Sequence, residues 1–381
     1  MTVASQETWV ALLSAPGKSA LASIGLSGPK GWEILKGVFL PRGGEKLPLI
    51  PTALETRLGR LGMGRGDEIV LGIQSVNPFH ARLHCHGGTQ VVKMALSQLE
   101  KAGARRCAWQ EFTRVEIPCR IQADSRIAVA QARTRKAAAV LTNQASGLLR
   151  EWFDSLVQTI RAKENTKAVE TINQIQNWSH LGSHLIHSWK VLVAGASNAG
   201  KSSLVNALVG FQRCLVSEIE GTTRDVLWWE TAMEGWPVNL ADMAGFRDNP
   251  TELEAEGLQI GLEQSEQADL CLWLLDPTRP LVFPPKSIPT EKLQFVVNKI
   301  DLLPLHRNWP QDAWLVSALK GEGVDALVKA IAKRLVPQDP PADQPIPHEE
   351  AFVIALQIAR EDLLAMRNND AVNHLSPWIM G

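Results

Sequence analysis

The stretch that decides the fold is the apolar run Val191-Leu-Val-Ala194 followed by Gly195-Ala-Ser-Asn-Ala-Gly-Lys-Ser202. The apolar run predicts a buried strand, and the apolar residues from Ser203 to Leu208 predict a helix. The pattern GxxxxGK[ST] between them is typical of a loop whose backbone N–H groups surround phosphate oxygens at a helix N-terminus. In such a loop Lys201 contacts the β- and γ-phosphates, and the Ser202 hydroxyl binds Mg²⁺. The sequence therefore predicts an α/β domain that binds a nucleotide.

Three further motifs follow in order, each after a predicted strand. Asp242-Met-Ala-Gly245 supplies a carboxylate for Mg²⁺ and a glycine N–H for the γ-phosphate. Asn298-Lys-Ile-Asp301 supplies a carboxylate that accepts from both N1–H and N2–H₂ of guanine. Adenine lacks this pair of donors, so ATP would leave the carboxylate unpaired. Ser317-Ala318-Leu319 completes the guanine pocket, and the chain is predicted to bind and hydrolyse GTP.

Two details of these motifs leave questions open. Phe246 follows Gly245 at a position where many GTPases carry the glutamine that orients the attacking water, so that group must lie elsewhere. Asn198 lies inside the phosphate loop. Its amide oxygen either braces the loop or helps to hold a monovalent cation beside the phosphates.

Length and patterning indicate several domains, since 381 residues allow two or three. Short apolar runs separated by Gly and Pro predict an N-terminal α+β domain at residues 1–120. Helical periodicity predicts a helical domain at 121–187, rejoined by 348–381, with the α/β domain at 188–335 inserted between these parts. Residues 336–347 contain five prolines and are predicted to form a stiff linker.

Composition narrows the cellular setting. Lys and Arg total 39 against 40 Asp and Glu, so any contact with nucleic acid needs a local basic patch. Five widely spaced cysteines without a CxxC pair argue against a disulfide framework or a zinc site. No apolar run approaches the roughly 20 residues of a membrane span, and the N-terminus lacks the basic region of a signal peptide. We expect a cytoplasmic protein without membrane contact.

The motifs resemble those of the MnmE (TrmE) family of tRNA-modification GTPases. The resemblance is strongest over residues 189–335, in SNAGKSSLVNAL, EIEGTTRDV, DMAGFR, NKIDL and VSALKGEGVDAL. It implies that Thr223 joins Ser202 and Asp242 around Mg²⁺. It also implies that Glu254 orients the hydrolytic water; without the resemblance, Glu254 is an ordinary acidic residue of a first helical turn.

The resemblance further implies a K⁺ site that forms when two GTPase domains dimerise. Its ligands would be Asn198, the carbonyls of Ser217 and Ile219, and Thr222. The residues expected to act in hydrolysis are Glu254 and Lys201. The residues expected to bind nucleotide and its cations are Asn198, Ala199, Gly200, Lys201, Ser202, Ser203, Thr222, Thr223, Asp242, Gly245, Asn298, Lys299, Asp301, Ser317 and Ala318.

Outside residues 189–335 the resemblance is looser. The segments ETWVALLSAPGKSALASIGLSGPKGWEIL and ARLHCHGGTQVV look like the family's folate-binding N-terminal domain, which also mediates dimerisation. The family's arginine before the SG pair aligns with Gly25, and its acidic residue before the HGG turn aligns with Arg82. The family's Cys-Ile-Gly-Lys tail has no counterpart, since the sequence ends in SPWIMG.

These features lead to an expected function and an alternative. The resemblance implies a K⁺-stimulated, homodimeric GTPase that acts with a folate derivative and an FAD-dependent partner, MnmG, on the wobble uridine of tRNA. The alternative is a GTP-gated dimerising scaffold that has lost the folate chemistry, which Gly25, Arg82 and the missing cysteine favour. A ribosome-assembly GTPase of the Era kind ranks third, because no GxxG-bearing RNA-binding module follows Leu335.

Overall fold

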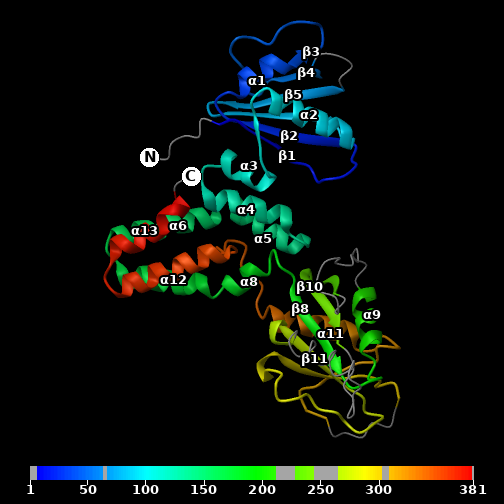
Figure 1. Cartoon of the computed structure of the whole chain (residues 1–381). Helices are drawn as coiled ribbons and strands as arrows, with labels where there is room; N and C mark the ends of the chain where they lie inside the picture. The colour runs from blue at the N-terminus through cyan, green and yellow to red at the C-terminus, as the bar shows by residue number, and fades with distance from the viewer. Residues whose placement is uncertain (1–6, 63–66, 212–227, 244–264, 303–308, 380–381) are drawn as a thin grey trace. The chain divides into compact units, whose positions relative to one another are not determined.

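The computed structural model describes residues 7–62, 67–211, 228–243, 265–302 and 309–379. The chain forms two compact units, Met1–Ile127 with Asn373–Gly381, and Ala128–Val372. Figure 1 shows a sheet in each unit, with helices predominant over residues 109–183 and 350–379. Within the described part of the chain, no helix combines the length and apolarity needed to cross a lipid bilayer.

The first unit is built on a seven-stranded sheet with the order β3-β4-β5-β6-β2-β1-β7. Its strands are β1 (Trp9–Leu12), β2 (Leu21–Ser27), β3 (Phe39–Pro41), β4 (Thr56–Leu61), β5 (Glu68–Val76), β6 (Phe79–His86) and β7 (Arg105–Arg106). Its helices are α1 (Gly31–Val38), α2 (Thr89–Lys101) and α3 (Trp109–Glu116). The sheet and the helices α1 and α2 share one apolar core, so this unit is the α+β fold that the short apolar runs predict.

The aromatic ring of Phe112 packs directly against Gly25 in this sheet. Gly25 on β2 pairs directly with Arg82 on β6. A Cβ at Gly25 would lie 2.5 Å from Cζ of Phe112, which belongs to α3. The Arg82 guanidinium lies over the same ring, 5.5 Å from its centroid, and donates to both carboxylate oxygens of Glu116 at 2.5 and 2.6 Å. Phe112 therefore occupies the space that a side chain at position 25 would need.

The helical part of the chain joins segments that are far apart in the sequence. Its helices are α4 (Arg120–Gln131), α5 (Arg135–Ala145), α6 (Leu148–Arg161), α7 (Asn165–Gln176), α8 (Ser179–Ser183), α12 (Glu350–Leu364) and α13 (Asn368–Ile379). Phe153 on α6 meets Phe352 on α12 edge to face, with ring centroids 5.5 Å apart. The amides of Asn165 and Asn368 bond each other at 2.5 and 3.0 Å. In the second unit the helix after the sheet thus shares a core with the helices before it.

The proline-rich segment 336–347 follows the surface of α5. The Gln144 amide donates to the carbonyl of Gln344 at 3.1 Å and accepts from the N–H of Ile346 at 3.1 Å. Ile346 itself is fully buried. Five proline rings and the two hydrogen bonds to Gln144 limit the conformations open to this segment.

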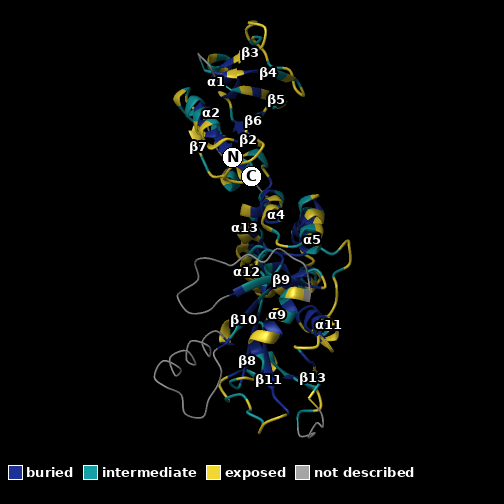
Figure 2. Ribbon diagram, turned by 90° about the vertical axis from the view of Figure 1, so that its right-hand side faces the viewer, coloured by how far each residue is buried: buried dark blue, intermediate teal, exposed yellow. Residues whose placement is uncertain are grey.

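A six-stranded sheet with the order β13-β12-β11-β8-β10-β9 forms the core of the second unit. Its strands are β8 (Trp189–Gly195), β9 (Trp228–Met233), β10 (Trp236–Asp242), β11 (Leu270–Leu275), β12 (Leu293–Val297) and β13 (Trp314–Leu315), with a 3₁₀ turn at Thr290–Lys292. Within this sheet β9 and β10 are antiparallel and the other described pairs are parallel. Strands β8 and β11 are buried almost throughout, as Figure 2 shows in dark blue, which is typical of strands covered on both faces.

The parallel strands carry the four sequence motifs to one edge of this sheet. Helices α9 (Lys201–Phe211) and α11 (Val324–Leu335) pack together, and α9 also contacts β8, β9 and β10. The phosphate loop follows β8, Asp242 ends β10, Asn298 follows β12 and Ser317 follows β13. Because the carboxyl ends of parallel strands meet at the same edge, residues separated by over 100 positions are neighbours there.

The packing at Gly25 leads to a test of stability. We expect Gly25→Ala to lower the free energy of unfolding of its unit by about 1–3 kcal/mol, because the new methyl group forces Phe112 and Leu13 to move. Gly72→Ala in the same sheet is the matched control, since its Cβ would lie 3.9 Å from the Arg82 carbonyl oxygen, an ordinary contact. Urea denaturation measures both variants. Equal stabilities would contradict the tight packing at Gly25.

Candidate nucleotide-binding site

The phosphate loop between β8 and α9 has a conformation that requires glycine at two positions. Gly195 has φ +142°, and a Cβ there would lie 2.6 Å from the carbonyl oxygen of Leu274. Gly200 has φ +94°, and a Cβ there would lie 2.3 Å from Nδ2 of Asn298. Asn198 has φ +65°, a region that asparagine enters more easily than most residues. The loop leads directly into the N-terminus of α9, where free N–H groups attract an anion.

Lys201 is a buried cation inside this loop. Its Nζ donates to the carbonyl oxygens of Gly195 at 3.4 Å and Ala196 at 3.2 Å. Burial lowers the pKa of Lys201, while the nearby Asp242 carboxylate opposes that shift. The two bonds are long for an ammonium group, so a phosphate oxygen can replace either carbonyl at little cost.

Ser202 and Asp242 form a donor set suited to a hard divalent cation. The Ser202 hydroxyl donates to Oδ2 of Asp242. The other carboxylate oxygen, Oδ1, is buried and accepts no hydrogen bond from the residues that the structure describes. A buried acceptor without a partner costs free energy, and a cation would satisfy it. Hydroxyl and carboxylate oxygens are ligands that Mg²⁺ prefers, so these two residues fit the magnesium site that the sequence predicts.

Asn298 ties the phosphate loop to the loop after β13. Its side chain is buried, with Nδ2 donating to the carbonyl of Ala199 at 2.9 Å and Oδ1 accepting from the N–H of Ala318 at 3.0 Å. The Asn298 N–H donates to the carbonyl of Leu275, at the end of β11, at 3.0 Å. One side chain thus fixes the distance between the two loops that would hold the phosphates and the base.

Lys299 adds a second tie and involves a residue that the sequence analysis missed. Its Nζ donates to the carbonyl of Asn198 at 2.7 Å and to Oδ2 of Asp276 at 2.6 Å. Burial works against ionisation of Asp276, but the bonds from Lys299 and Thr278 outweigh it, so its pKa lies below its usual value. The signal available in the sequence was an aspartate directly after the buried run Leu270–Leu275, at the same sheet edge as the motifs.

Asp301 faces a pocket of about 240 Å³ at the end of β12 and β13. Its Oδ1 accepts from the Ser317 hydroxyl at 2.6 Å, and Ser317 is fully buried. The pocket is lined by Gly200, Ser203, Asn298, Lys299, Asp301, Leu302, Ser317, Ala318 and Leu319. All the residues predicted to choose the base therefore line one pocket, and Gly200 of the phosphate loop borders it.

Several residues with predicted roles lie outside the described part of the chain. They are Ser217, Ile219, Thr222, Thr223, Gly245 and Glu254. Phe246 lies outside it as well. The role of Thr223 as a magnesium ligand, most of the K⁺ ligands and the group that orients water therefore remain predictions.

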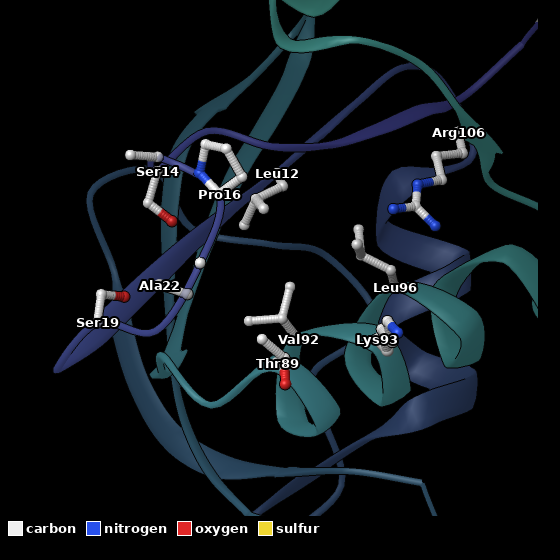
Figure 3. Close-up of a pocket in the computed structure, with 12 residues that line it drawn as sticks. Leu12, Ser14, Pro16, Ser19, Ala22, Thr89, Val92, Lys93, Leu96 and Arg106 are labelled. Carbon is white, nitrogen blue, oxygen red and sulfur yellow. The ribbon is translucent and has the colours of Figure 1, made fainter. Parts of the chain in front are cut away.

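A separate cavity of about 150 Å³ lies in the first unit, and Figure 3 shows its lining. Leu12, Val92 and Leu96 lie toward its middle, and Ser14 and Arg106 lie on opposite sides. The other lining residues are Ala15, Pro16, Gly17, Ser19, Ala22, Thr89 and Lys93. This volume is below the roughly 300 Å³ of a typical small-molecule pocket, and the lining includes neither Gly25 nor Arg82.

Comparison with known proteins places the chain among the GTPases. The family model of the 50S ribosome-binding GTPases matches residues 190–302. The tRNA modification GTPase MnmE of Paramagnetospirillum magneticum is 31% identical over 371 residues, which cover 86% of this chain and 82% of that protein. MnmE of Geobacter sulfurreducens is 30% identical over 295 residues, covering 67% of this chain and 64% of that protein. The solved structure of Era from Aquifex aeolicus bound to GDP and AlF₄⁻ is 25% identical, with a TM-score of 0.32 over 46% of this chain and 66% of that one.

The family model and the MnmE relatives agree with the geometry of the pocket. The family model covers the phosphate loop, the strand that ends at Asp242 and the guanine motif at Asn298, so the P-loop GTPase domain predicted from the sequence is confirmed. The match to the Paramagnetospirillum protein extends over most of both chains, well beyond that domain. The chain is a GTP hydrolase and belongs to the MnmE family of tRNA modification GTPases.

Proposed function

We propose that this protein couples GTP hydrolysis to the modification of the wobble uridine in tRNA. Similarity over most of the chain to relatives named tRNA modification GTPases is the observation that carries the proposal. The nucleotide pocket supports it, because each described residue expected to bind phosphate, Mg²⁺ or guanine lies at one edge of a single sheet. The enzyme would act in the cytoplasm as a homodimer with an MnmG-like FAD protein.

The proposed architecture is a GTPase domain at 188–335 inserted in a helical domain formed by 121–187 and 348–381, after a folate-binding-like domain at 1–120. The contact of Phe153 with Phe352, and the bonds between Asn165 and Asn368, support a helical domain made from both sides of the insertion. Motion of the GTPase domain would then be transmitted through the two chain connections that flank it, one of them the segment 336–347.

In the proposed mechanism the chain's own residues hold the phosphates and direct the water. Lys201 would exchange its carbonyl partners for β- and γ-phosphate oxygens, and Ser202, Thr223 and Asp242 would hold Mg²⁺, which neutralises charge on those oxygens. Glu254 would accept a proton from the water and orient it, the task that Phe246 cannot perform. Asp301, positioned by Ser317, would select guanine.

We further propose that Asn198, the carbonyls of Ser217 and Ile219, and Thr222 bind K⁺ when two GTPase domains dimerise. A cation there supplies the positive charge that an arginine finger supplies in other GTPases. The bond from Lys299 to the Asn198 carbonyl supports this role, because it holds the backbone of Asn198 while its amide stays available.

Asp301→Asn tests the base pocket. The substitution replaces a guanine acceptor by an amide, so GTP affinity is expected to fall by about 10²-fold or more, while affinity for xanthosine triphosphate rises. Fluorescence titration with labelled nucleotides measures both affinities. Asp325→Asn, on the exposed surface of α11, is a matched control that should change neither. An unchanged preference for GTP in Asp301→Asn would reject the pocket assignment.

Hydrolysis in KCl and in NaCl of equal ionic strength tests the cation site, because matched ionic strength removes general screening. We expect the hydrolysis rate to be at least about tenfold higher in K⁺ than in Na⁺. An arginine finger raises the rate of other GTPases by more than this, and the K⁺ ion would take over its role. Asn198→Gly should abolish the difference and leave GTP affinity intact, because glycine adopts φ +65° without strain. Equal rates in both salts for the unaltered protein would exclude the K⁺ mechanism.

A GTP-gated dimerising scaffold without folate chemistry is a second candidate, favoured by one region of the first unit. Phe112 fills the space beside Gly25, and Glu116 accepts hydrogen bonds from Arg82. At these two positions the resemblance implies an arginine and an acidic residue in the family, so the side chains expected to contact folate are not present here. A folate derivative would have to bind through other contacts.

Complementation separates the two candidates. We expect the gene, expressed with the MnmG-like protein of its own organism in a bacterium lacking MnmE, to restore the modified wobble nucleoside, measured by mass spectrometry of digested tRNA. Lys201→Ala should abolish the signal, because the phosphates lose their cation. Normal GTP hydrolysis without the modified nucleoside would instead establish the scaffold.

A further inference from the structure

Two histidines and an aspartate converge at the end of the six-stranded sheet opposite the phosphate loop. His180 lies on α8, His184 follows α8 as its C-cap, and Asp269 directly precedes β11. Ligand atoms from all three lie within 4.8 Å of one another, and no other such group of three occurs among the described residues. Strand β8 separates this cluster from the phosphate loop by about 20 Å, at roughly 3.3 Å per residue.

One pair of atoms in the cluster has the spacing found between ligands of a tetrahedral metal site. His180 and His184 are four positions apart, so they lie on one face of the helical turn. Nε2 of His184 lies 3.4 Å from Oδ1 of Asp269. Bonds of about 2.0–2.2 Å from a metal to nitrogen and oxygen, at the tetrahedral angle, also place ligand atoms about 3.4 Å apart.

The outer contacts orient both His184 and Asp269 toward the same point. Nδ1 of His184 lies 3.1 Å from the His187 carbonyl oxygen, which can only accept, so this nitrogen carries the proton. In the neutral ring the lone pair of Nε2 therefore faces the Asp269 carboxylate, and two acceptors face each other. Oδ2 of Asp269 accepts from the Lys190 N–H at 2.7 Å, and the His184 ring stacks on Trp189 at 3.7 Å between centroids. Ligands of known metal sites are held by such outer bonds.

We propose that His180, His184 and Asp269 bind a divalent transition-metal ion, with Zn²⁺ as the type case, which fastens α8 to the base of the GTPase sheet. Two imidazole nitrogens and one carboxylate oxygen suit Zn²⁺, Co²⁺ or Ni²⁺ better than Mg²⁺, and water would complete the coordination. This inference is independent of the proposed function, because the cluster lies away from the nucleotide.

The two imidazole rings of the cluster lie close together, edge to face with centroids 5.0 Å apart. A simple His184–Asp269 ion pair is the competing explanation, and it would require neither His180 nor a metal.

Calorimetric titration of the full-length protein with CoCl₂ tests the proposal, in excess Mg²⁺ and GDP so that the nucleotide site is filled. We expect one equivalent to bind and to give d–d absorption without the thiolate charge-transfer band that binding to cysteine would produce. His180→Ala removes an exposed ring and Asp269→Asn keeps the shape of the carboxylate. Each should weaken binding at least about tenfold, because even outer-contact changes cost that much.

His187→Ala is the matched control, since it removes an exposed imidazole seven positions from His180 but keeps the carbonyl that orients His184. Its Co²⁺ affinity should equal that of the unaltered protein. GDP binding by every variant checks that each is folded. The proposal would be overturned if Co²⁺ binding were not saturable or if a thiolate band appeared. It would also be overturned if His180→Ala and Asp269→Asn bound Co²⁺ as tightly as the unaltered protein, and the His184–Asp269 ion pair would then be the explanation.

Discussion

The buried amide of Asn298 is the interaction on which the nucleotide site depends. It uses its donor on Ala199 in the phosphate loop and its acceptor on Ala318 in the base loop, residues 99 and 20 positions away in the chain. A buried amide that lost either partner would leave a polar group unsatisfied, at a cost of about 1–3 kcal/mol. The same amide explains Gly200, because any side chain there would collide with Nδ2. The two loops proposed to bind the phosphates and the base are therefore held together as one unit.

The Asp276–Lys299 pair also holds the phosphate loop in place, and it makes the stability of the fold depend on pH. Bonds from Lys299 and Thr278 depress the pKa of Asp276 in the folded chain against the effect of burial. A depressed pKa stabilises the fold above the ordinary aspartate pKa, and this contribution is lost as the pH falls through the folded value. At neutral pH the pair is intact, and Lys299 holds the Asn198 carbonyl in place.

In the first unit, Gly25 and Arg82 are direct partners across β2 and β6. They are the two positions at which the sequence analysis expects a departure from the family pattern. An arginine on one strand and an acid on the other would face each other there. Here the arginine comes from β6, its acidic partner Glu116 comes from α3, and Phe112 fills the space above Gly25. The Arg82–Glu116 charge pair therefore joins the sheet to a helix.

The sequence by itself determined the phosphate loop, the strands around it and the order of the nucleotide motifs. These features depend on local constraints, such as positive φ at Gly200 and continuous apolar runs in strands covered on both faces. Strand β8 extends further at each end than the predicted run 191–194, because its pairing with β10 and β11 continues there.

Only the tertiary structure decided which distant residues meet. The cysteine spacing predicted no zinc site, yet two histidines before β8 lie beside an aspartate more than 80 positions later, because β8 and β11 are parallel neighbours. The partnership of Asp276 with Lys299 and that of Arg82 with Glu116 arise in the same way. Local backbone preference acts over a few residues, whereas sheet register brings together side chains that no spacing in the sequence relates.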